Sequence, residues 1–188
     1  MAPYNRYMSE IDTDFFRTIC LQHGETRSYR KGEYLLHEEV FPYVGLVESG
    51  VFKYSCPGTE GKTHTIGFAF EGEFVGDYPN CLYQRKPEVQ IQALTPCRVI
   101  LCPAEKLMQH FEQSLENQTH ARIAAEQLFM QIYSRYMDLY RFTPEERYQQ
   151  LLRQHREMVQ RIPLKEIASF LRITPIHMSR IRKKLLQE

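Results

Sequence analysis

Short runs of alternating apolar and polar residues occupy the chain between residues 25 and 102. Glycine and proline separate these runs, which cover residues 34–36, 43–47, 51–54, 63–70, 89–94 and 98–101. A period of two is typical of half-buried strands, because successive side chains point to opposite faces of a sheet. Strands this short, recurring at roughly 8–12-residue intervals, predict an antiparallel sandwich or barrel.

Helical periodicity replaces this alternation after Pro103. Helices are predicted over residues 14–23, 104–111 and 117–142, and the last carries two apolar stripes. One stripe, predicted to be a dimer interface, contains Ala125, Phe129, Ile132, Tyr136 and Leu139, and the other contains Met130, Tyr133, Met137 and Tyr140. One apolar stripe is enough to pack a helix on its own domain. Two stripes therefore predict that the helix is covered on one side by that domain and on the other by a second copy of the chain. The alternative is a central helix buried within one monomer.

A boundary follows at residue 143, where Thr143 and Glu146 form a capping-box pattern around Pro144. Beyond it, two short amphipathic helices are predicted from apolar positions at Leu164, Ile167, Ala168 and Leu171, and then at Met178, Ile181 and Leu185. Between them Arg172 begins a three-residue turn, and Thr174 is suited to cap the second helix. This arrangement is typical of a helix-turn-helix that binds DNA.

The opposite face of the second helix is predicted to bind DNA. Its candidate residues are Thr174, Ile176, His177, Ser179, Arg180, Arg182, Lys183 and Lys184. Arg180 suits a guanine edge, Ser179 and His177 suit bases or phosphates, and Ile176 suits a thymine methyl group. Three basic residues, Arg182, Lys183 and Lys184, suit phosphates, which supply affinity without sequence information. The structural alternative is a solvated basic helix end, favoured by the helix dipole.

Charge supports the same division of the chain. Residues 143–188 carry ten Lys/Arg and five Asp/Glu, whereas residues 1–142 carry fourteen and eighteen. A basic C-terminal module on an acidic body indicates a polyanionic partner for that module.

We find no stretch of about 18 consecutive apolar residues and no secretory pattern at the N-terminus, so no membrane partner is predicted and a cytoplasmic location is expected.

Both halves together resemble the CRP/FNR family of transcription regulators. The segment Phe70-Glu-Gly-Glu-Phe-Val-Gly-Asp-Tyr is similar to the family's Gly-x-Phe-x-Gly-Glu motif, and Met178-Ser-Arg-Ile fits its helix-turn-helix. The resemblance implies an α+β fold: an N-terminal double-stranded β-helix (a jelly-roll-like β-roll) as sensor over residues 1–116, a dimerisation helix over 117–142, and an all-α DNA-binding domain over 143–188. It also implies a homodimer that reads an inverted repeat, with half-sites about one DNA turn apart.

Departures from the family pattern fall in the ligand-binding segment. Pro87 and Glu88 stand where cyclic-nucleotide-binding members have an Arg-Ser or Arg-Thr pair that grips the phosphate. Glu88 repels a phosphate and Pro87 offers no charge or N–H, so cyclic AMP or GMP binding is not expected. A shifted ligand site has only weak candidates, Asp77, Arg85, Lys86 and Glu88.

Two departures affect the DNA-binding domain. Arg172 occupies a turn position where the family usually has glycine, so we expect strain or an adjusted turn there. Pro175 and Ile176 replace residues with which some members read bases, so the DNA sequence read by those members is not expected to transfer.

No cofactor or metal is predicted, and no catalytic residue is assigned. The five cysteines include no CxxC pair, and only Cys20 lies near the N-terminus, where iron–sulfur members have a cluster. The weak candidates for a haem ligand are His23, His37, His64, His110 and His120.

Predicted partners are double-stranded DNA, a second copy of the chain, RNA polymerase and an unidentified small-molecule effector. The alternatives are a non-DNA ligand-binding or protein-interaction module and a cupin-type metalloenzyme built on His37, Glu38, Glu39 and His64.

Overall fold

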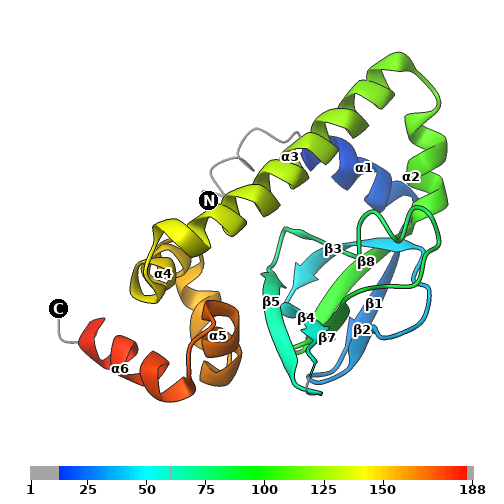
Figure 1. Cartoon of the computed structure of the whole chain (residues 1–188). Helices are drawn as coiled ribbons and strands as arrows, with labels where there is room; N and C mark the ends of the chain where they lie inside the picture. Colours follow the sequence, from blue (N-terminus) through cyan, green and yellow to red (C-terminus); the bar gives the residue numbers. More distant parts are fainter. Residues whose placement is uncertain (1–12, 60, 186–188) are drawn as a thin grey trace. The chain divides into compact units, whose positions relative to one another are not determined.

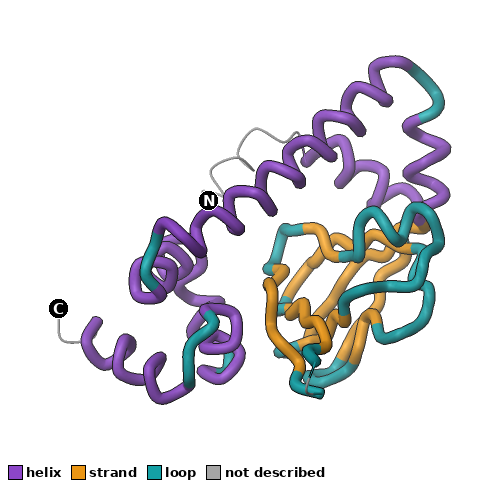
Figure 2. The backbone as a smooth tube through the Cα atoms, in the orientation of Figure 1, coloured by secondary structure: helices purple, strands orange, loops and turns teal. Residues whose placement is uncertain are grey.

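The computed structural model describes residues 13–59 and 61–185 of the 188-residue chain. The chain divides into two compact units, and the boundary between them falls between Asn117 and Gln118, within one long helix (Figure 1). We call them the β-roll unit, which ends at Asn117, and the helical unit, which begins at Gln118. Every described strand lies in the β-roll unit, which also contains two short helices, whereas the described part of the helical unit contains helices alone (Figure 2).

Eight described strands form two four-stranded antiparallel sheets in the β-roll unit. They are β1 (Glu25–Tyr29), β2 (Tyr34–Leu36), β3 (Tyr43–Ser49), β4 (Phe52–Pro57), β5 (Thr63–Ala69), β6 (Phe74–Val75), β7 (Gln90–Ala93) and β8 (Cys97–Pro103). The strand orders are β1-β8-β3-β6 and β2-β7-β4-β5. The expected two-sheet β architecture is therefore confirmed, and the long and C-terminal helices complete the predicted fold class.

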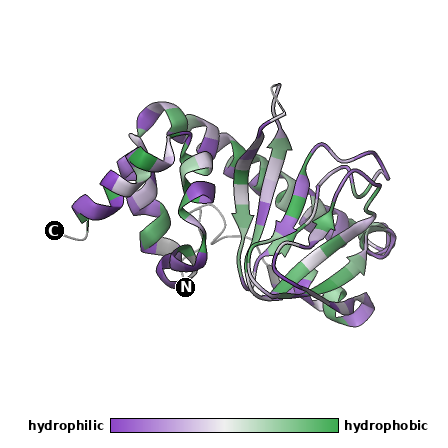
Figure 3. Cartoon of the chain, turned by 90° about the horizontal axis from the view of Figure 1, so that it is seen from below, coloured by the Kyte–Doolittle hydropathy of each residue, from purple (hydrophilic) through white to green (hydrophobic). Residues whose placement is uncertain are grey.

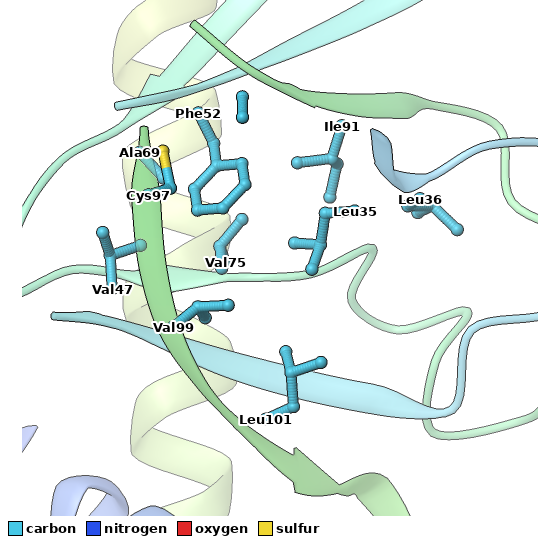
Figure 4. Close-up of a cluster of buried hydrophobic side chains, with 11 residues drawn as sticks. Leu35, Leu36, Val47, Phe52, Ala69, Val75, Ile91, Cys97, Val99 and Leu101 are labelled. Atoms are coloured by element: carbon cyan, nitrogen blue, oxygen red, sulfur yellow. The ribbon is translucent and has the colours of Figure 1, made fainter. Parts of the chain in front are cut away.

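An apolar core fills the space between the sheets (Figure 4). Its buried members are Leu35, Leu36, Val47, Phe52, Ala69, Val75, Ile91, Ala93, Cys97, Val99 and Leu101. Strand β8 shows how the alternation produces two faces: Val99 and Leu101 enter this core, whereas Ile100 and Cys102 belong to a second cluster. Burial of each such aliphatic side chain stabilises the fold by about 1.5–3 kcal/mol.

The second cluster joins one sheet to two helices, α1 (Thr13–His23) and α2 (Ala104–Phe111). Ile19 and Cys20 of α1 pack with Leu107 of α2 and with Cys102 of β8. The prediction that Cys97 and Cys102 are small core residues is confirmed, because both are buried free thiols.

The helical unit contains most of α3 (Leu115–Arg141), followed by α4 (Pro144–Arg161), α5 (Leu164–Leu171) and α6 (Pro175–Leu185). Its buried apolar residues are Tyr148, Leu151, Val159, Ile162, Ile167, Ala168, Leu171, Met178 and Ile181. The predicted capping box at the start of α4 is present: the Glu146 amide donates to the Thr143 hydroxyl at 3.3 Å, and the Thr143 amide donates to the Glu146 carboxylate at 2.8 Å. The Thr143 amide and the Thr143 hydroxyl both donate to the Glu146 carboxylate, and these two hydrogen bonds lower the pKa of Glu146.

Two strands were not predicted from the pattern. Strand β1 pairs with β8 over Glu25–Tyr29 at a sheet edge, with its first four side chains exposed, so it has no apolar alternation to detect. Strand β6 has only two residues. The long helix runs from Leu115 to Arg141, compared with the predicted residues 117–142.

Candidate DNA interface and sensor loop

Helices α5 and α6 form the predicted helix-turn-helix. Ala168 of α5 and Met178 and Ile181 of α6 are buried where the two helices pack. A small residue at position 168 allows the helices to approach closely. The Thr174 hydroxyl accepts the His177 amide at 3.2 Å, so Thr174 is the predicted N-cap of α6.

Arg172 adopts the left-handed conformation in the turn, with φ 58° and ψ 42°. The expected strain is therefore present, and the backbone has kept the left-handed turn instead of adjusting it. Amides of Arg172 and Ile173 donate to the Ser169 and Ala168 carbonyls, each at 3.0 Å, and so close the C-terminus of α5. Arg147 of α4 adds a third contact, because its Nη2 donates to the Leu171 carbonyl at 3.0 Å.

One side of α6 faces solvent while the other packs in the helical unit, and Figure 3 shows hydrophilic and hydrophobic segments along the C-terminal helices. Exposed residues from the predicted set are Thr174, Ile176, His177, Ser179, Arg180, Lys183 and Lys184. Ile176, Arg180 and Lys183 are spaced by four and then three residues, so they share a face of α6. The structure therefore brings an apolar, a guanidinium and an ammonium group together on one exposed surface.

Two predicted phosphate-binding residues instead contact the helical unit. Arg182 is half-buried close to Tyr148, and burial raises the pKa of Tyr148 although the positive charge of Arg182 lowers it. Lys184 forms an ion pair with Glu145 of α4 at 2.7 Å. Sequence patterns do not identify these two contacts, which join residues 34 and 39 positions apart.

The predicted dimer stripe of α3 is largely exposed. Phe129, Ile132 and Tyr136 are 64%, 59% and 53% exposed, Leu139 is also exposed, and Ala125 is half-buried. None of the 27 residues of α3 is buried. Tyr133 and Tyr140 of the second stripe are exposed too.

A kink in α4 at His155 was not predicted. His155 has non-helical dihedral angles, φ −136° and ψ 41°, inside the helix, and it is buried. Burial, followed by the nearby positive charge of Arg135 on α3, lowers the pKa of His155 to about 4. His155 is therefore neutral near neutral pH. The sequence around it contains no proline or glycine that would mark a kink.

The loop after β6 is closed by hydrogen bonds within the loop and by one to Tyr54 of β4. Asp77 Oδ2 accepts the Glu88 amide and the Asn80 side-chain amide, each at 3.1 Å. The amide of Gly76 donates to the Tyr54 hydroxyl at 3.1 Å. The Gly76 amide and the Asp77 carboxylate, which belong to the segment that resembles the nucleotide-binding motif, are thus used within the fold, as is the Glu88 amide.

The weak ligand candidates lie outside the pocket described for the β-roll unit. Lys86 and Glu88 are exposed, and the Arg85 guanidinium lies 5.4 Å from the centroid of the Tyr83 ring. A pocket of about 390 Å³ beside α2 is lined by Pro42, Tyr43, Cys81, Leu82, Gln84, Pro103, Ala104, Glu105 and Met108. None of the four candidates lines it.

Metal-ligating side chains do not cluster: residues 13–59 and 61–185 contain no group of three or more His, Cys, Asp or Glu arranged to hold a metal ion. In the same part of the chain, no helix has both the length and the apolar character needed to cross a membrane.

Comparison with known proteins supports the fold. Residues 26–114 match the family described as the cyclic nucleotide-binding domain. No curated protein matches the chain. Among solved structures, FixK2 from Bradyrhizobium japonicum is 19% identical, with a TM-score of 0.73 over 87% of this chain and 85% of that one.

Two further solved structures cover nearly the whole chain. The c-di-GMP-responsive global regulator CLP of Xanthomonas campestris is 18% identical, with a TM-score of 0.64 over 93% of this chain and 92% of that one. The catabolite activator protein of Thermus thermophilus is 14% identical, with a TM-score of 0.57 over 97% and 87%. The predicted resemblance is thus confirmed for the domain family and the fold.

Proposed function

We propose that this chain, which combines the cyclic nucleotide-binding domain fold with a C-terminal helix-turn-helix, is a DNA-binding transcription regulator that works as a homodimer. The exposed face of α6 is the observation on which the proposal rests. It presents Arg180 and Lys183 to solvent, while Met178 and Ile181 anchor the helix from behind. A helix held in this way enters the major groove with its polar side toward the bases.

The exposed residues divide the work of binding by their chemistry. Arg180 forms a bidentate pair with a guanine edge, and Ser179 and His177 donate to bases or phosphates. Lys183 binds a phosphate and contributes affinity without sequence preference. Arg182 and Lys184 support α6 from the side through Tyr148 and Glu145, so we assign them a smaller part in phosphate binding than Lys183.

A second copy of this chain covers the exposed stripe of α3. Phe129, Ile132, Tyr136 and Leu139 form a run of large apolar side chains that one chain leaves in water. Such patches mark interaction sites in soluble proteins. The same stripe on two copies is self-complementary, which is the requirement for a twofold dimer. The dimer presents two copies of α6 and therefore reads an inverted repeat.

Cyclic nucleotides are not required for this activity. A cyclic phosphate needs cationic groups and free amides, but the Gly76 and Glu88 amides already donate to Tyr54 and Asp77. Pro87 has no N–H, and the Glu88 carboxylate repels an anion. Any effector of the β-roll unit therefore differs from cyclic AMP or GMP in its chemistry.

Salt dependence of DNA binding tests the proposal. Fluorescence anisotropy with a duplex of arbitrary sequence is measured between about 50 and 200 mM salt, where each phosphate contact contributes about 0.9 to the logarithmic slope. Tight binding at low salt that weakens steeply supports the proposal. The control variant for this measurement is Lys106→Ala, which removes an exposed lysine of α2 in the β-roll unit, outside the proposed DNA-binding face of α6. Absence of salt-dependent binding by the folded protein would overturn DNA binding.

A further inference from the structure

Ile176 has an unusual position for a large aliphatic residue. It lies in the first turn of α6 and is 69% exposed, although Met178 and Ile181 on the same helix are buried. Its neighbours on the exposed side are His177, Ser179 and Arg180. Packing within the helical unit therefore does not account for an isoleucine at this position.

The thymine methyl group is the one apolar feature that a base edge presents in the major groove of unmodified DNA. An isoleucine has no hydrogen-bond donor or acceptor, so it distinguishes bases by apolar contact and by excluding water from polar edges. Cytosine and the purines offer polar atoms at the corresponding edge, which an aliphatic side chain would leave without a partner.

We infer that Ile176 is a specificity-determining residue that selects thymine in each half-site through contact with its 5-methyl group. This inference rests on the proposed DNA binding and adds the identity of one base. Ile176 and Arg180 are four residues apart on α6, so their Cβ atoms are about 5–6 Å apart. Successive bases are about 3.4 Å apart along the duplex. The selected thymine therefore lies within about two base pairs of the guanine that Arg180 reads.

Replacement of single thymines by deoxyuridine tests the inference, because deoxyuridine pairs like thymine and lacks only the methyl group. The probe is the duplex that the protein enriches from a random library, with each half-site thymine replaced in turn. Loss of one buried methyl group predicts about a 3- to 10-fold weaker Kd at one position.

Variants assign that loss to Ile176. Ile176→Ala binds thymine and deoxyuridine duplexes equally, whereas Ile176→Val and the control Lys106→Ala, at an exposed residue of α2 in the β-roll unit, keep the discrimination. Since Ile176 is exposed, thermal unfolding of Ile176→Ala matches that of the wild type. Discrimination that persists in Ile176→Ala would overturn the inference, as would wild-type binding that is insensitive to every deoxyuridine near the guanine. Both results leave DNA binding intact, whereas wild-type protein that binds no duplex would overturn the proposed function and this inference together.

Discussion

Lys184 at the end of α6 lies 2.7 Å from the Glu145 carboxylate in the first turn of α4. Its neighbour Lys183 is exposed on the face of α6 that carries Arg180. Two adjacent lysines on the same helix therefore have different surroundings. Lys184 joins two helices of the helical unit, and Lys183 faces solvent.

This difference predicts different effects of two matched substitutions. Lys183→Ala weakens specific and non-specific DNA binding alike and reduces the salt slope by about 1, because one phosphate contact is lost. Lys184→Ala changes the salt slope less and lowers the free energy of unfolding by at most about 1 kcal/mol, as expected for a partly exposed ion pair. Anisotropy titrations and urea unfolding measure the two effects. An equal reduction of the slope in both variants would contradict the assignment.

Arg180 is predicted to read a base. Arg180→Ala costs about 1–3 kcal/mol on the specific site and relaxes the sequence preference at one position, because a bidentate contact with guanine is lost. Its exposed position means that the fold is unaffected. Binding to operator duplexes with each base changed in turn provides the measurement. A variant with unchanged selectivity would remove Arg180 from base reading.

Phe129 is predicted to hold the dimer together. Phe129→Asp places a charge in the apolar stripe of both copies, so the dimer dissociates at least about 30-fold more readily. The 64% exposure of Phe129 in the single chain means that the substitution leaves the monomer fold intact. Sedimentation equilibrium measures the change.

A control on the same helix is Glu116→Ala, which removes an exposed polar residue outside the stripe. It leaves the dimer unchanged. A dimer that tolerates Phe129→Asp as well as this control would show that another surface joins the two copies.

His155 is predicted to make stability depend on pH. Its pKa is about 4 in the folded chain, below the ordinary value of 6.5, so the unfolded state binds the proton more readily. The free energy of unfolding therefore falls as the pH drops from 6.5 toward 4, by at most about 1.4 kcal/mol per pH unit. Urea unfolding followed by circular dichroism measures this slope. His155→Gln flattens it, whereas the exposed control His177→Gln does not; equal slopes in both variants would contradict the role of burial at His155.

Cyclic AMP and cyclic GMP are predicted to leave the Tm of the protein unchanged. The amides of Gly76 and Glu88 are used by Tyr54 and Asp77, so no phosphate site is available to stabilise the folded state. A ligand at 100 times its Kd would stabilise the protein by about 2.7 kcal/mol, which a thermal scan detects readily. A concentration-dependent rise in Tm with either nucleotide would show that the loop opens to bind it.

Local patterns predicted much of the fold and of the DNA interface. Alternation identified strands such as β7 with its buried Ile91, and capping residues placed the starts of α4 and α6 at Thr143 and Thr174. Strain or an adjusted turn was expected at Arg172, and the turn is left-handed. These features depend on neighbours within a few residues, which a single sequence displays.

Features that depend on distant partners were not predicted. The edge strand β1 forms because β8 offers hydrogen bonds, although its own side chains are polar and exposed. Closure of the loop after β6 depends on Tyr54, which is 22 residues from Gly76. The support of α6 by Glu145 depends on a pair 39 residues apart. Such contacts follow from the folded arrangement and leave no periodic signal in the sequence.

Selection of bound sequences from a random duplex library tests the central claim most directly. Purified protein is used without added ligand at about 0.15 M salt, where long-range charge effects are screened. The account predicts enrichment of an inverted repeat whose half-sites lie about one DNA turn apart. A folded, dimeric protein that enriches no sequence would contradict it.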